Sequence, residues 1–153
     1  MAGIAIWERP PVDSEKEERE EDKEYKEDEK KFTAIISPEL TAWMDGDLAT
    51  GSERLSEESF GEQRKAAWNL TILCVDPGYQ GQGIVRKLAD PGMKKAWAEN
   101  RPIILDTGNR NVVKMYERFG FRVKGETTFH IPGTSGSSTW WAMMAAVPPK
   151  CED

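Results

Sequence analysis

The chain has 153 residues and a formal net charge of −6, which is enough for one domain with a hydrophobic core. The negative charge argues against a nucleic acid or an anionic membrane as the main partner. We find no apolar stretch of the ~20 residues that a membrane helix needs, and no start typical of a secretory signal. The two cysteines, Cys74 and Cys151, do not suggest a disulfide framework. We therefore expect a soluble protein in the reducing cytoplasm.

The chain opens with a short strand-like run, Gly3–Trp7, that two prolines close. A strongly charged segment follows, because residues 13–31 hold 11 acidic and 6 basic side chains. Such a composition cannot build a hydrophobic core. We predict that residues 12–31 form a solvated insertion, either as a charge-laced helix or as a disordered loop.

Two helices are predicted between this insertion and the middle of the chain. Ser37 followed by Pro38 is typical of a helix start, and the first helix runs to about Met44. Gly46 and Gly51 interrupt the helical pattern. The second helix is expected over residues 56–67.

The second half of the chain alternates strand and helix patterns. Trp68–Val75 is apolar and β-branched, which predicts a buried strand. A helix is expected over residues 84–100, with a kink or restart at Pro91 that Asp90 would cap. The remaining elements are a strand over 102–105, a helix over 111–119, and an antiparallel pair over 121–129 and 139–145. The order predicts an α/β sheet with helices packed on it.

A glycine-rich loop joins the strand Trp68–Val75 to the helix after it. Glycines let successive backbone N–H groups face one anion, and the start of a helix attracts phosphate. A Walker loop is excluded because no Gly-Lys-Ser/Thr follows, and a dinucleotide fingerprint would need glycine where Arg86 stands. On the loop alone, a phosphorylated cofactor and an ordinary glycine-rich turn both stay open.

Two motifs resemble those of the GNAT N-acetyltransferases. The segment from Leu73 to Ile84, with its Gln80-Gly81-Gln82-Gly83 core, is similar to motif A of that family. The segment from Asn109 to Phe121 is similar to motif B. The resemblance covers residues 68–148, the expected acetyl-CoA-binding core, and weakly residues 3–8. The segment that begins at Trp68 and the Trp-Trp-x-Met that begins at Trp140 look most like fungal members of the family.

The resemblance implies a single GNAT-like domain over residues 1–153. Its fold would be α/β (α+β), a mixed, largely antiparallel sheet with flanking helices. Such domains begin with elements that have no counterpart ahead of Gly3, so we expect an N-terminally incomplete domain. The strand Gly3–Trp7 would then be an exposed sheet edge, which favours a homo-oligomer.

The resemblance also implies the roles of individual residues. Tyr116 would be the catalytic acid that protonates the departing thiolate, a role that suits a phenol. Acetyl-CoA would be the co-substrate, with its pyrophosphate on the backbone of the glycine loop and its pantetheine arm along the preceding strand. The expected acetyl-CoA-binding residues are Leu73, Cys74, Val75, Gln80, Gly81, Gln82, Gly83, Ile84, Val85 and Asn109.

The implied reaction is direct attack of an amine on the acetyl thioester, with neither a metal nor a covalent intermediate. The acceptor would be a small-molecule or protein amine. No general base is assigned by the motifs, and Glu8 on the first strand is a weak candidate. Cys74 is expected to be a buried strand cysteine, and His130 a structural or solvated residue. A catalytically weak or inactive acyl-CoA-binding protein is the alternative.

Overall fold

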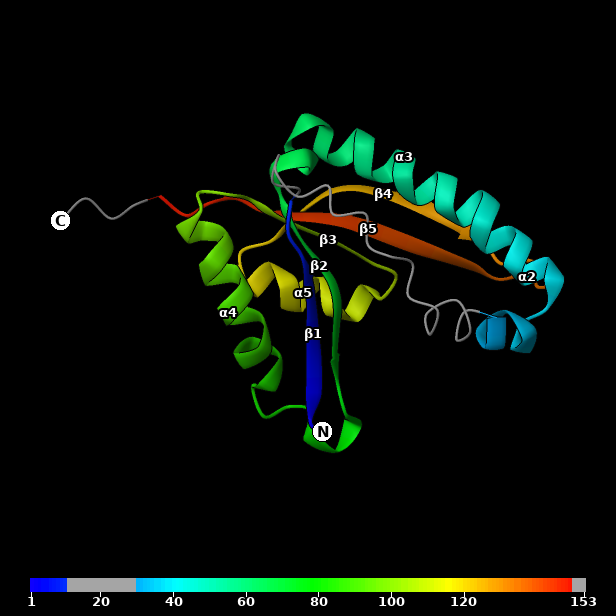
Figure 1. Cartoon of the computed structure of the whole chain (residues 1–153), viewed down its shortest axis with the longest axis horizontal. Coiled ribbons are helices and arrows are strands. Elements are labelled where there is room, and N and C mark those ends of the chain that lie inside the picture. Colours follow the sequence, from blue (N-terminus) through cyan, green and yellow to red (C-terminus); the bar gives the residue numbers. More distant parts are fainter. Residues whose placement is uncertain (11–29, 150–153) are drawn as a thin grey trace.

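The computed structural model describes residues 1–10 and 30–149, and its described part is built around one sheet (Figure 1). The predicted insertion over residues 12–31 therefore lies almost entirely outside the described residues. The helices and strands are β1 (Gly3–Glu8), α2 (Pro38–Trp43), α3 (Ala49–Phe60), β2 (Trp68–Val75), α4 (Ile84–Ala98), β3 (Ile103–Thr107), α5 (Arg110–Arg118), β4 (Arg122–His130) and β5 (Ser137–Ala145). Three short helical segments, Met44–Leu48, Gly61–Ala66 and Pro77–Tyr79, lie between them.

The five strands pair in the order β1-β2-β3-β5-β4. Only β2 and β3 run parallel, and all other neighbours are antiparallel. This mixed, largely antiparallel sheet with flanking helices confirms the predicted fold class. The predicted strands and the predicted helix over 111–119 are also confirmed, with shifts of one or two residues at their ends.

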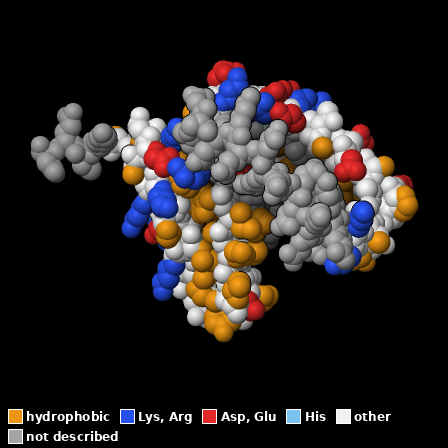
Figure 2. All heavy atoms as spheres, in the orientation of Figure 1, with side chains coloured by type: hydrophobic (Ala, Val, Ile, Leu, Met, Phe, Trp, Pro, Cys, Tyr) orange, Lys and Arg blue, Asp and Glu red, His pale blue; other side chains and the backbone are white. Residues whose placement is uncertain are grey.

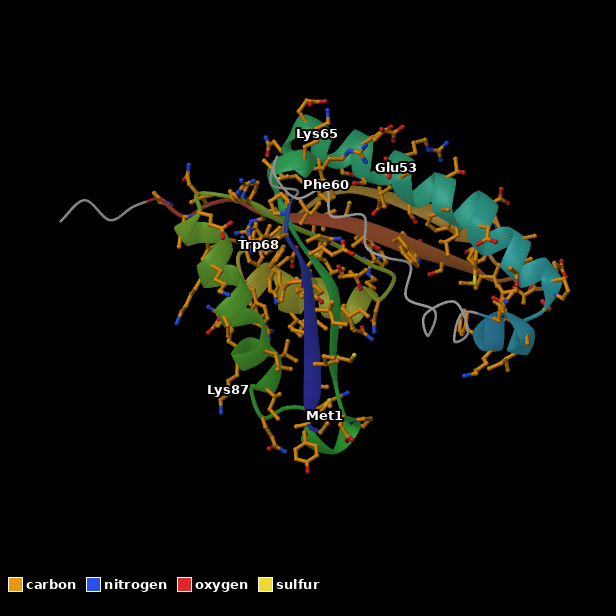
Figure 3. The ribbon with its side chains drawn as sticks, viewed as in Figure 1. Met1, Glu53, Phe60, Lys65, Trp68 and Lys87 are labelled. Carbon is orange, nitrogen blue, oxygen red and sulfur yellow. The ribbon has the colours of Figure 1, made fainter. Side chains whose placement is uncertain are left out.

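Alternation along the strands divides the core into two clusters, one on each face of the sheet. Ile103, Leu105 and Met143 belong to the larger cluster, which packs against α4 and α5. Ile104 and Met144, their neighbours in sequence, belong to the smaller cluster beneath α3. Figure 3 labels one residue of each cluster, Trp68 at the start of β2 and Phe60 at the end of α3. The sheet therefore has a packed core on each face.

Helix α3 lies along β4 and β5 (Figure 1), and it begins earlier than its sequence predicts. The expected interruption at Gly46 and Gly51 is wrong, because both residues are helical. A side chain at position 51 would collide with the Phe129 ring, so Gly51 lets α3 approach the sheet closely. Tertiary packing here outweighs the poor helix propensity of glycine.

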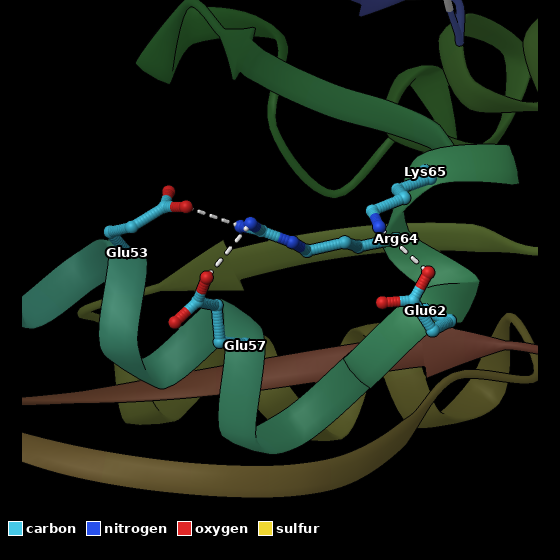
Figure 4. A network of polar contacts seen from close by, with 5 residues as sticks. All are labelled: Glu53, Glu57, Glu62, Arg64 and Lys65. Carbon is cyan, nitrogen blue, oxygen red and sulfur yellow. Dashed lines mark hydrogen bonds and ion pairs between the residues drawn. The ribbon is translucent and has the colours of Figure 1, made fainter.

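Arg64 fastens the segment after α3 back onto that helix (Figure 4). Its guanidinium lies 2.6 Å from the Glu53 carboxylate and 3.1 Å from that of Glu57, one turn further along α3. Lys65 pairs with Glu62 at 2.7 Å within the same short segment. These ion pairs link the segment after α3 to that helix near the start of β2.

Helix α4 continues through Pro91 without a break, so the predicted restart of the helix is wrong. Asp90 does not cap a new helix, because its carboxylate lies 2.6 Å from the Arg86 guanidinium within one helix. Ala89, Met93 and Ala96 are almost completely buried against the sheet. Burial of this face compensates for the backbone hydrogen bond that proline cannot donate.

Strand β1 is an edge of the sheet. Ala5 and Trp7 pack on the core beneath α4. Ile4 and Ile6 point to the opposite face, where each is 41% exposed, as is Ile72 on β2 opposite Ile6. Figure 2 shows apolar side chains gathered over this part of the molecule.

Candidate active site

The glycine-rich loop between β2 and α4 has the local structure of an anion site. Gly81 has a φ of +76° and Gly83 a φ of +73°, a left-handed conformation that side chains rarely adopt. Apart from the adjacent residues of the chain, no described atom lies within 4 Å of the position where either would carry a Cβ. Gly83 is the N-cap of α4, so the unpaired N–H groups and the positive end of that helix dipole lie at the loop.

Two side chains hold the loop in this shape. The Asp76 carboxylate accepts a hydrogen bond of 2.8 Å from the Gly78 N–H. The Gln80 side-chain amide donates one of 3.2 Å to the Val75 carbonyl at the end of β2. The loop is therefore tied to the strand before it, and its glycines are preorganised rather than merely flexible.

Strand β2 leaves a backbone edge unpaired beside the loop. Its pairing with β3 consists of Trp68 with Ile103 and Asn69 with Ile104, whereas its pairing with β1 continues to Val75. From Leu70 onward the β2 edge that faces β3 has no strand partner in the described residues. Apart from the Val75 carbonyl, which accepts the hydrogen bond from Gln80, the N–H and C=O groups that point away from β1 on this edge can bind an extended ligand.

A cavity of about 650 Å³ adjoins both the loop and this strand edge. It is large enough for a sizeable cofactor. All the predicted binding residues except Gln82 line it, and so does Tyr116. The lining residues with predicted roles are Leu73, Cys74, Val75, Gln80, Gly81, Gly83, Ile84, Val85, Asn109 and Tyr116.

Tyr116 enters the cavity from α5 with its ring largely buried. The ring packs edge-on against Phe121, with centroids 5.6 Å apart, and against Phe119 at 6.5 Å. Burial raises the pKa of the Tyr116 phenol, and the negative charge of Asp106 raises it further. The phenol therefore stays protonated at neutral pH and can donate its proton.

Asn109 caps α5. Its side-chain oxygen accepts a hydrogen bond of 2.9 Å from the Asn111 N–H, and its own N–H donates to the Thr107 hydroxyl at 3.2 Å. Asn109, Asn111 and Thr107 all line the cavity. The cap leaves the Asn109 NH₂ group as a hydrogen-bond donor for a ligand.

The structure also shows where Cys74, Glu8 and His130 lie. The predicted burial of Cys74 is wrong, because its thiol lies on the exposed face of β2. Glu8 does not line the cavity; it accepts a 3.1 Å hydrogen bond from Asn69 at the far end of β1. His130 is exposed at the end of β4. Among residues 1–10 and 30–149, no cluster of acidic, histidine or cysteine side chains could hold a metal ion.

Asp106 is a candidate functional residue that the motifs do not identify. Desolvation by the surrounding protein raises the pKa of its carboxyl, although a backbone hydrogen bond opposes the rise. A single aspartate after an apolar strand carries no signal in the sequence. Asp106 keeps an exposed surface and lines a small cavity between α3 and the sheet.

Comparisons with known proteins agree with the motifs. A sequence model of the acetyltransferase (GNAT) domain family matches residues 21–131, so the match begins well ahead of Trp68. Mycothiol acetyltransferase of Propionibacterium freudenreichii subsp. shermanii is 36% identical over 74 residues, which are 46% of this chain and 24% of that protein.

Solved structures of acetyltransferases are similar over about half of the chain. The ribosomal-protein-S18-alanine N-acetyltransferase of Escherichia coli aligns at a TM-score of 0.48 and 23% identity, over 57% of this chain and 58% of that one. Chaetomium thermophilum Naa20, in complex with a bisubstrate analogue, aligns at a TM-score of 0.47 and 20% identity, over 53% of this chain and 47% of that one. The chain thus spans about a quarter of the curated relative and about half of these two structures.

Proposed function

The chain belongs to the acetyltransferase (GNAT) domain family, and on that premise we propose that it transfers an acetyl group from acetyl-CoA to an amine. The observation that carries the proposal is the cavity of about 650 Å³ between the glycine loop, the unpaired edge of β2 and Tyr116. Its three walls fit the three parts of the co-substrate: phosphate, pantetheine and thioester. The transfer is direct, with neither a metal nor a covalent intermediate on the protein.

Each wall has a separate task in this proposal. The backbone N–H groups from Gly81 to Val85 bind the pyrophosphate at the start of α4. The backbone groups of Leu73–Val75 that no other residue engages pair with the amides of the pantetheine arm, and Asn109 adds a side-chain contact. Tyr116 donates its proton to the thiolate that leaves when the acetyl group is transferred.

The acceptor is an amine of a small molecule or of a protein. The names of two similar proteins specify mycothiol and a ribosomal-protein alanine, so relatives differ in acceptor. The expected likeness to fungal members, the incomplete N-terminal part, the cytoplasmic location and self-association through the β1 edge stay predictions. Among the described helices, none is long and apolar enough to cross a membrane.

Isothermal titration with acetyl-CoA tests the binding half of the proposal. Gly83→Val should weaken binding at least tenfold, about 1.4 kcal/mol, because it adds a side chain where the pyrophosphate would lie. Gly61→Val is the matched control. Gly61 also has a positive φ, +52°, and open space around it, but it does not line the cavity.

The two variants separate backbone strain from ligand contact. Equal affinity of Gly83→Val and the wild-type chain would remove the loop from the proposed site. A CoA-release assay over a panel of primary amines tests the transfer half. Tight acetyl-CoA binding with no release for any amine would favour the alternative, an acyl-CoA-binding protein without catalytic activity.

A further inference from the structure

Strand β1 supports the candidate active site without lining it. None of the described residues that line the large cavity comes from β1. The strand nevertheless pairs with the part of β2 that does line the cavity, because Gly3 lies opposite Val75 and Ala5 lies opposite Leu73. This part of β2 therefore has β1 on one edge and the expected pantetheine arm on the other.

At Gly3 the strand has no room for a side chain. A Cβ atom there would lie 2.6 Å from the Cys74 carbonyl oxygen on β2 and 2.9 Å from Leu88 Cδ1 on α4. Real Cβ atoms essentially never approach another atom within 3.0 Å. Gly3 is not among the glycines with a positive φ, so close packing, and not backbone conformation, requires glycine at this position.

A second glycine repeats this contact with the two elements exchanged. Gly92 lies one turn after Leu88 on α4 and is buried. A Cβ atom at position 92 would collide with the indole ring of Trp7 on β1. Each element thus supplies one glycine and one large side chain, and α4 lies alongside β1 (Figure 1). These two contacts fix the position of α4 along β1.

The residue before Gly3 is bonded to the segment that leads into the glycine-rich loop. The Ala2 carbonyl accepts a hydrogen bond of 3.0 Å from the Asp76 N–H, and the Asp76 carbonyl accepts one of 2.8 Å from the Tyr79 N–H. The start of β1 therefore contacts both elements that form the expected phosphate site. It contacts the loop through Asp76 and the first turns of α4 through Leu88.

We propose, on the basis of the acetyl transfer proposed above, that Gly3 is a positioning residue for acetyl-CoA. It sets the distance between the strand edge for the pantetheine arm, Leu73–Val75, and the helix start for the pyrophosphate. Because these two parts of the co-substrate are covalently joined, they bind together only when the two parts of the protein lie at the matching distance. A side chain at position 3 pushes β1, β2 and α4 apart and spoils this match.

This role concerns binding and not the chemical step. Tyr116 is on α5, which is not among the elements that a side chain at position 3 would meet. A displaced phosphate site weakens the ground state and the transition state alike, so KM for acetyl-CoA rises while kcat stays the same. A residue needed only for folding would lower the melting temperature and leave the affinity of the folded chain unchanged.

The test compares Gly3→Ala with Gly51→Ala. Both variants add a methyl group to a close contact, but Gly51 packs on Phe129 and does not line the large cavity. The chains are titrated with acetyl-CoA by calorimetry at a temperature where circular dichroism shows them to be folded. Gly3→Ala should raise the Kd at least about fivefold, whereas Gly51→Ala should stay within about twofold of the wild-type value. Both variants should have lower melting temperatures.

Leu88→Ala keeps the test decisive if Gly3→Ala does not fold. It removes the other side of the contact without adding atoms, and it should raise the Kd of acetyl-CoA at least about threefold. The inference is overturned if Gly3→Ala binds as the wild-type chain does, or if it loses no more affinity than Gly51→Ala. An unchanged Kd of Leu88→Ala also overturns it, and in all these cases the proposed acetyl transfer stands. A wild-type chain that binds no acetyl-CoA refutes the proposed function itself, and this inference with it.

Discussion

Desolvation acts on two titratable residues near the large cavity, Tyr116 on α5 and Asp106 on β3. For Tyr116 it stabilises the neutral phenol, which is the form a proton donor needs. For Asp106, which keeps an exposed surface on β3, partial desolvation disfavours the charged carboxylate.

Tyr116→Phe should lower kcat by about 10²–10⁴-fold, the usual contribution of an acid–base group. Acetyl-CoA affinity should change little, because phenylalanine keeps the ring contacts with Phe119 and Phe121. Single-turnover CoA release and titration with acetyl-CoA measure the two quantities separately. A kcat within twofold of the wild-type value would mean that Tyr116 is only a packing residue.

Asp106→Asn should raise the melting temperature at neutral pH. The folded-state pKa of Asp106 lies above its ordinary value of 3.8, so its contribution to stability is present below that value and is lost as the pH rises through the folded pKa. An asparagine avoids this loss. The advantage of the variant over the wild-type chain should therefore shrink as the pH falls toward 4.

Thermal unfolding of both chains at several pH values measures this difference. A variant that is less stable than the wild-type chain at neutral pH would contradict the prediction. It would indicate that the charged carboxylate makes a stabilising contact in the folded state.

At the level of the elements, α3 depends on a glycine for its position on the sheet. Gly51→Ala should destabilise the chain, because the added methyl group meets the buried Phe129 ring. Overpacking of this kind costs about 1–3 kcal/mol, more than the helix propensity gained. Gly46→Ala is the control, since nothing lies within 4 Å of its added Cβ, and it should be neutral or stabilising by up to about 1 kcal/mol.

Urea denaturation followed by circular dichroism gives both free energies of unfolding. The prediction requires the two alanine variants to differ in sign or by at least about 1 kcal/mol. Equal stability of the two variants would show that α3 moves away from the sheet at little cost. In that case the small cavity between α3 and the sheet would also change shape at little cost in free energy.

Those elements that depend on local signals could be predicted from the sequence. The apolar run of β2, the glycine loop and the amphipathic face of α5 each identify their structure within a dozen residues, and most of the large cavity follows from them. The helical state of Gly51 and Pro91 could not be predicted, because Gly51 packs against Phe129 and the residue after Pro91, Gly92, packs against Trp7, both far away in sequence. Asp106 was missed for the same reason. Its environment is created by α3, whose place on the sheet no local pattern encodes.

For the molecule as a whole, the free β1 edge and its apolar neighbours favour self-association. Ile6→Lys should raise the Kd of self-association at least about tenfold, equivalent to about 1.4 kcal/mol. The control is Ile35→Lys, which changes an isoleucine that is 82% exposed in another part of the chain. Analytical ultracentrifugation measures both. A monomeric wild-type chain, or equal effects of the two variants, would contradict the prediction.

Of the paired strands in the described sheet, β1 and β2 are the furthest apart in sequence. Glu8 and Asn69, which face each other on β1 and β2, are 61 residues apart in sequence, whereas Thr128 and Thr139 in the β4–β5 hairpin are separated by 11. Loop-closure entropy makes the hairpin the cheaper contact to form, so β1 docks late in folding. Until it docks, β2 has no partner beside Leu73–Val75 on either edge. The last step of folding therefore completes the wall on which the cofactor would lie, and bound acetyl-CoA should oppose the first step of unfolding.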